Sequence, residues 1–76
     1  MELNDEDKAE LQRVWDALAN LFYTDPVWRL NYNNFYMMSL ADQYRWWYRA
    51  KAQARKGAPA MQTLLAKVIE LRLTGR

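Results

Sequence analysis

The sequence predicts a small all-α domain: a three-helix up-down bundle, with a fourth helix if a turn at 26–31 is also helical. Apolar residues recur at the spacing of one helix face along three long stretches. Each of the two prolines follows a helix-ending segment, and proline suits the first position of the next helix. A chain of 76 residues has room for one hydrophobic core, so we expect residues 1–76 to form a single domain.

The first helix is predicted over about 5–23. Asn4 can cap its start, and the three acidic residues that follow favour the positive end of the helix dipole. Neither glycine nor proline interrupts this stretch. Its predicted inward face is a stripe of large apolar residues at helical spacing, namely Leu11, Val14, Trp15, Leu18, Leu21 and Phe22.

The segment 26–32 is predicted to be a turn or a short helix. A proline after an aspartate favours a helix start, whereas three nearby asparagines weaken a helix because their side chains compete for backbone hydrogen bonds. We expect a break near 31–34, with a new cap at Asn33 or Asn34. The alternative is one continuous helix over 26–56, about 46 Å long at the usual helical rise.

Two more helices complete the predicted fold. The first spans about 35–56 and ends at Gly57, since glycine is the favoured residue just past a helix. The second spans about 59–73, begins with Pro59 and is closed by Gly75. Helices joined by such short connections are expected to pack as an up-down bundle.

Aromatic residues exceed what so small a core is expected to enclose. The chain holds four Trp, five Tyr and two Phe. Each of these side chains carries about 150–250 Å² of surface that favours burial. We therefore expect part of this aromatic surface to lie in an interface, and we predict a homodimer.

The predicted helix 35–56 carries apolar residues on two sides. Its expected core face consists of Tyr36, Met37, Leu40, Ala41, Tyr44, Trp47 and Tyr48. Trp and Arg, which are enriched in binding hot spots, lie on the other side. The predicted partner-binding residues there are Phe35, Met38, Asp42, Arg45, Trp46 and Arg49. The alternative is structural: the segment 27–34 or the end of the chain covers Phe35 and Trp46.

The charges are unevenly distributed. Residues 1–25 carry seven acidic and two basic side chains, a net charge of −5, and residues 26–76 carry nine basic and two acidic ones, a net charge of +7. One interpretation is a nucleic-acid-binding module that uses Arg45, Arg49, Lys56 and Arg72. The other is pairing inside the bundle. It would place Asp5, Asp7 and Glu10 opposite Arg49, Arg55 or Lys56.

The composition does not favour an enzyme. The sequence has no histidine, the usual general base near neutral pH, and no cysteine, which could supply a thiolate nucleophile or a disulfide. We expect no catalytic residue, no cofactor and no metal site. No apolar run approaches the about 20 residues that cross a bilayer, so we expect a cytoplasmic protein without a membrane partner.

The sequence therefore predicts a protein-binding regulator, inhibitor or adaptor that acts by steric occlusion of another protein. Small cysteine-free helical proteins of phages and mobile elements offer an analogy of size and style. Nucleic-acid binding is one alternative, and a subunit or assembly chaperone of a larger complex is another. We expect Trp46→Ala to abolish partner binding or dimerisation while changing thermal stability little.

Overall fold

The computed structural model describes residues 3–74, and these form four α-helices without a strand. The helices are α1 (Asp5–Leu21), α2 (Pro26–Tyr36), α3 (Leu40–Arg55) and α4 (Pro59–Leu73). The all-α prediction is confirmed. Predicted helix 59–73 coincides with α4, while its expected closing residue Gly75 lies outside the described residues. None of the described helices is both long and apolar enough to span a bilayer.

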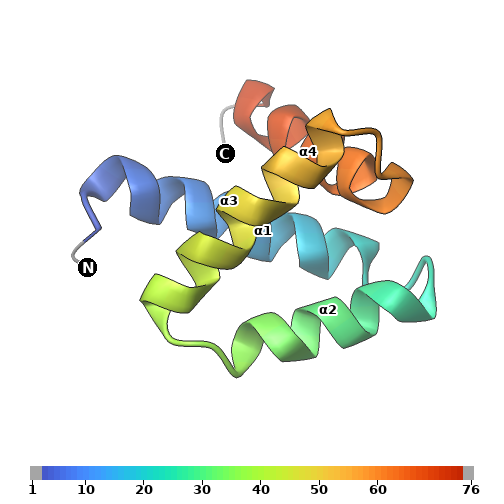
Figure 1. The fold of residues 1–76 in the computed structure, drawn as a ribbon, viewed down its shortest axis with the longest axis horizontal. Coiled ribbons are helices and arrows are strands. Elements are labelled where there is room, and N and C mark those ends of the chain that lie inside the picture. The colour runs from blue at the N-terminus through green and yellow to red at the C-terminus, as the bar shows by residue number, and fades with distance from the viewer. Residues whose placement is uncertain (1–2, 75–76) are drawn as a thin grey trace.

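Helix α1 is the centre of the arrangement. It contacts each of the other three helices, and α4 packs against both α1 and α3. Figure 1 shows α2 running beside α1 in the opposite direction, while α3 crosses over α1 at a steep angle. The predicted up-down bundle is therefore not confirmed. The result is compact, with a radius of gyration of 11.7 Å over the Cα atoms.

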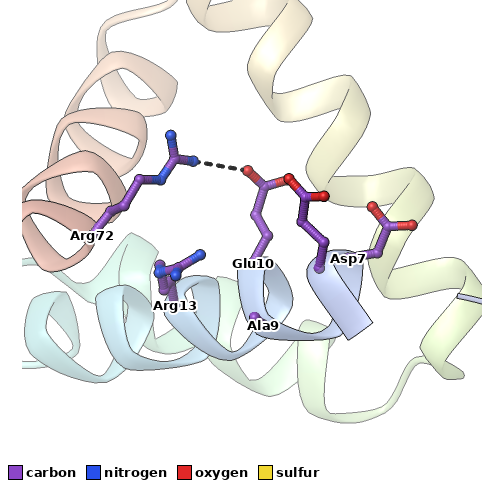
Figure 2. Close-up of a pocket in the computed structure, with 6 residues that line it drawn as sticks. Asp7, Ala9, Glu10, Arg13 and Arg72 are labelled. Atoms are coloured by element: carbon purple, nitrogen blue, oxygen red, sulfur yellow. Dashed lines mark hydrogen bonds and ion pairs between the residues drawn. The ribbon is translucent and has the colours of Figure 1, made fainter. Parts of the chain in front are cut away.

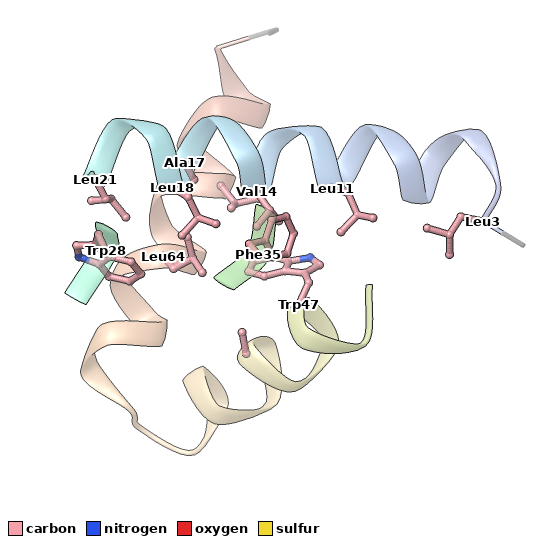
Figure 3. Packing of buried hydrophobic residues seen from close by; sticks show 12 residues of the cluster. Leu3, Leu11, Val14, Ala17, Leu18, Leu21, Trp28, Phe35, Trp47 and Leu64 are labelled. Carbon is pink, nitrogen blue, oxygen red and sulfur yellow. The ribbon is translucent and has the colours of Figure 1, made fainter. Parts of the chain in front are cut away.

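One hydrophobic core holds the helices together. The stripe predicted on α1 lies at its centre, where Leu11, Val14 and Leu18 are almost fully buried. Figure 3 shows these side chains pointing toward Phe35 of α2 and Trp47 of α3. Burial of each large apolar side chain stabilises the fold by about 1.5–3 kcal/mol.

The break between the second and third predicted helices is five to six residues later than expected, because the cap is Ser39 and not Asn33 or Asn34. Helix α2 continues through the asparagines to Tyr36, and Ser39 caps α3 by accepting a hydrogen bond from the Asp42 N–H at 3.2 Å. The predicted helix start at residue 35 and the continuous alternative over 26–56 are therefore wrong, whereas the predicted end before Gly57 is confirmed.

Aromatic packing explains why the asparagines do not end α2. Trp28 and Phe35 are buried on one side of this helix, and the Tyr32 ring lies 5.2 Å from the Trp15 ring of α1 in an edge-to-face arrangement. These contacts need a helical backbone throughout, and they outweigh the weak helix preference of Asn33 and its neighbours.

The later break changes which residues of α3 face inward. The buried stripe is Gln43, Trp47, Ala50 and Ala54. Four members of the predicted core face are exposed instead: Tyr36, Met37, Leu40 and Tyr48. Phe35, predicted to face outward, is 0% exposed because it belongs to α2 and packs under α1.

Candidate functional site

The exposed side of α3 carries two tyrosines and two arginines in parallel rows. Tyr44 and Tyr48 are one helical turn apart, as are Arg45 and Arg49. With Ala52, these residues line an open hollow of about 530 Å³. We call these five residues the α3 outer face. Tyr48 is 59% exposed, so a large ring at this hollow remains accessible to a partner.

The two arginines differ in their pairing. Arg45 forms an ion pair with Asp42 at 2.8 Å, and both side chains are more than half exposed. Arg49 takes part in none of the ion pairs found within residues 3–74. An exposed guanidinium that has no internal ion pair can donate two parallel hydrogen bonds to a carboxylate of a partner. Arg49 is thus the most available cation on this side of α3.

Arg49 also joins the hollow of the α3 outer face to two smaller ones. A hollow of about 260 Å³ is lined by Met38, Asp42, Arg45, Trp46 and Arg49. A hollow of about 220 Å³ lies toward α2 and α4, lined by Asn31, Trp46, Arg49, Ala50, Gln53 and Met61. The structure thus brings together five of the six predicted partner-binding residues, and Phe35 is the exception.

Trp46 is both a lining residue and part of the fold. Its ring is half-buried and packs edge-to-face on Phe35, with ring centroids 5.3 Å apart. Phe35 is therefore buried, but by α1 rather than by residues 27–34, and Phe35 itself covers one side of Trp46. The other side of Trp46 lines both smaller hollows.

The tyrosine row lies beside the start of α1. The pKa of Tyr44 is raised above its usual value, chiefly by the negative charge of Asp7 and further by partial burial, Glu10 and Tyr48. On the same side, the Lys51 ammonium lies 5.7 Å from the centre of the Tyr48 ring, within the range of a cation–π contact. Carboxylates therefore flank the tyrosine row, away from the arginines.

The charges of α1 are paired inside the molecule, but not as predicted. Glu10 accepts hydrogen bonds from Lys51 of α3 at 3.3 Å and from Arg72 of α4 at 3.1 Å. Figure 2 shows the Arg72 contact at a hollow of about 460 Å³, with Arg13 beside it and Asp7 nearer to α3. The predicted partners Arg49, Arg55 and Lys56 form no such pair within residues 3–74. Pairing across helices thus accounts for part of the charge asymmetry.

The alternative nucleic-acid set is not gathered on one surface. Arg45 and Arg49 are neighbours, and Lys56 follows directly after α3. Arg72 is on α4, where Glu10 engages it. Two arginines and one lysine remain on one side of α3, which allows few phosphate contacts and only weak, salt-sensitive binding.

The tyrosine row was missed because the helix was started too early in the sequence. Beginning the helical wheel at Phe35 places Tyr44 and Tyr48 in the core. A signal for the correct start was present: Ser39 followed three residues later by Asp42 has the pattern of a helix N-terminal capping box. With the helix starting after Ser39, Tyr36 no longer belongs to it. Its core face then does not have to run from Tyr36 to Tyr48.

Comparisons with known proteins add no assignment to this geometry. No protein-family model matches the chain, and neither a curated protein nor a solved structure matches it at a significant level. The functional argument therefore rests on the residues of the surface itself.

Proposed function

We propose that this protein is a non-catalytic, cytoplasmic protein-binding regulator that docks through the α3 outer face. The observation that carries the proposal is a single one: Arg49, without an ion pair in the described chain, stands between three adjoining hollows beside the exposed Tyr48 ring. Tyr, Trp and Arg are the residue types that most often dominate the free energy of protein–protein binding.

The shape of this surface supports a protein partner more than a nucleic acid. The hollow of the α3 outer face has Ala52 between the two rows, so an apolar side chain of a partner can sit against Tyr44 and Tyr48. Carboxylates of the same partner can then meet Arg45 and Arg49. A nucleic-acid surface of this size would need more cations to reach useful affinity at physiological salt.

The proposed mechanism is occlusion. Helix α3 is packed into the core on its inner side by Trp47, and its C-terminal part contacts α4. Its outer side is therefore a rigid surface. A rigid surface loses little conformational entropy on binding. A body of 32 × 27 × 25 Å held on a partner by this surface would block access to the region beneath it.

The test compares capture of proteins by the wild-type chain and two double variants in cells of the source organism, using chemical crosslinking and quantitative mass spectrometry. Tyr48→Ala/Arg49→Ala alters the α3 outer face. Tyr23→Ala/Arg29→Ala removes one exposed tyrosine and one exposed arginine elsewhere and is the matched control. Thermal denaturation of each variant checks that the fold is retained.

We expect at least one protein to be retained by the wild type and the control, and its recovery to fall about tenfold or more with Tyr48→Ala/Arg49→Ala. Equal recovery with all three chains contradicts the proposal. So does a captured species that disappears on nuclease treatment, because it would identify nucleic acid as the ligand.

A further inference from the structure

The geometry points to a second copy of this chain as an occupant of the α3 outer face; this inference rests on the proposed function of that surface. Three rows of unlike character lie side by side there. Asp7 at the start of α1 is next to Tyr44, whose pKa it raises. The tyrosine row follows, and the arginine row borders the hollow that contains Trp46.

This order of rows is complementary to itself. Consider a dimer whose two-fold axis lies in the interface and runs parallel to α3. Rotation about this axis leaves each residue at the same height along the helix and exchanges the two lateral sides of the surface. The tyrosine row of one copy then faces the arginine row of the other. Such an interface is isologous, so every contact occurs twice.

The resulting contacts are favourable at each level of the helix. Tyr44 meets Arg45 of the second copy, and Tyr48 meets Arg49 of the second copy, giving four arginine–aromatic contacts in total. The chain already uses a related contact internally, where the Lys51 ammonium lies 5.6 Å from the centre of the Trp47 ring. Guanidinium groups stack on aromatic faces more readily than ammonium groups do.

The outer rows add charge complementarity. Asp7 takes part in no ion pair within residues 3–74, and the same is true of Arg49. The two-fold axis parallel to α3 brings the acidic edge of one copy toward Arg49 of the other. The antiparallel alternative, with the axis perpendicular to α3, sets arginine against arginine and is disfavoured.

Two features keep the dimer weak. Arg55 and Lys56 of both copies lie at the same end of the paired helices, so the helices must diverge there to limit repulsion. The rows also span only about one and a half helical turns, which is small beside the about 800 Å² per partner of a standard interface. We expect a dissociation constant on the order of 10–100 µM.

The test is sedimentation equilibrium of the full chain and of two charge-reversed variants. Asp7→Lys makes the acidic edge positive, and Arg49→Glu replaces the arginine that has no ion pair within residues 3–74 by a negative charge. We expect the wild type to dimerise, each variant alone to dimerise at least about tenfold more weakly, and an equimolar mixture of the two to recover association. Recovery in the mixture requires that Asp7 of one copy lies near Arg49 of the other.

Matched controls carry the same charge changes away from the rows. Asp16→Lys lies on the opposite side of α1 from Asp7, and Arg29→Glu lies on α2. Both should dimerise as the wild type does at moderate salt. Circular dichroism checks the fold of every variant.

Three outcomes overturn the inference: a wild type that remains monomeric at about 1 mM, a dimer equally tight in all variants, and a mixture that fails to associate. None of these outcomes contradicts the proposed function, which is tested separately by whether capture of another protein depends on Tyr48 and Arg49. Capture of such a protein by a strictly monomeric chain would identify that protein as the occupant instead.

Discussion

Gln43 is the polar residue at which the turn between α2 and α3 is held. Its side-chain amide donates hydrogen bonds to the backbone carbonyls of Phe35 at 3.1 Å and Met38 at 3.3 Å. Its own oxygen is buried without a partner, so only the donor side contributes to stability. The residue satisfies the Met38 carbonyl and gives a second donor to the Phe35 carbonyl, which also accepts the Met38 N–H at 3.2 Å.

Replacing Gln43 by methionine tests this role, because methionine keeps most of the volume and removes the donor. We expect the free energy of unfolding to fall by about 1–3 kcal/mol, the cost of leaving the Met38 carbonyl unpaired. Chemical denaturation measures it. Gln53→Met, at an exposed position of the same helix, is the control and should be nearly neutral.

Trp46 combines packing with exposure, and the structure changes what its removal should do. Full burial would make the loss about 3–5 kcal/mol. Because the ring is half-buried on Phe35, we expect Trp46→Ala to lower the free energy of unfolding by about 1–3 kcal/mol. Trp47→Ala, at a fully buried ring, should cost more. Equal losses for the two variants in chemical denaturation would contradict this placement.

The raised pKa of Tyr44 makes stability depend on pH in the alkaline range. The folded chain holds this phenolic proton more tightly than the unfolded chain does. Stability from this group is therefore present below the usual tyrosine pKa and is lost as pH rises through the raised value. Asp7→Asn should lower the pKa of Tyr44, as followed by the NMR signals of its ring. An unchanged titration would show that Asp7 does not set it.

At the scale of elements, the start of α3 is the feature that most affects the surface. Ser39 supplies the cap, and Asn34 lies within α2. We expect Ser39→Ala to lower the free energy of unfolding by about 1 kcal/mol, since a capping side chain is lost. Asn34→Ala should be neutral or slightly stabilising, since alanine is the better helix former. Thermal denaturation giving the opposite ranking would place the break near Asn34.

Local signals were sufficient for α1 and α4 and for the end of α3. Helix α1 has an Asn4 cap whose side chain accepts the Asp7 N–H, and α3 ends at Gly57, whose φ of +97° is the left-handed conformation that favours glycine. Helix α4 likewise begins at its predicted proline. The extent of α2 could not be read locally, because Trp28 and Phe35 stabilise it through contacts with a helix distant in sequence.

At the scale of the whole molecule, part of the aromatic surface is exposed as expected, but it belongs to tyrosines. All four tryptophans are buried or half-buried, while Tyr23, Tyr36 and Tyr48 are exposed. A phenolic hydroxyl can remain in water while the ring covers apolar surface, which suits tyrosine to the rim of a small core. The sequence therefore predicted that some aromatic surface stays exposed, and it misplaced the residues that provide it.

A second apolar surface lies on α2. Val27, Leu30 and Met37 are exposed along its outer side. Polar residues separate them, and isolated apolar side chains are common on protein surfaces. The α3 outer face, by contrast, lines one hollow with the exposed Tyr48 ring and with Arg49, which has no ion pair within residues 3–74. The two surfaces therefore make different predictions about where a partner lies.

Site-specific photo-crosslinking in cells of the source organism distinguishes them most directly. A photoreactive phenylalanine derivative is placed at position 48, on the α3 outer face, or at position 30, on α2, and the adducts are identified by mass spectrometry. We predict protein adducts from Tyr48 and few or none from Leu30, both positions being exposed. Adducts from Leu30 alone would contradict the claim that this protein binds its partners through α3.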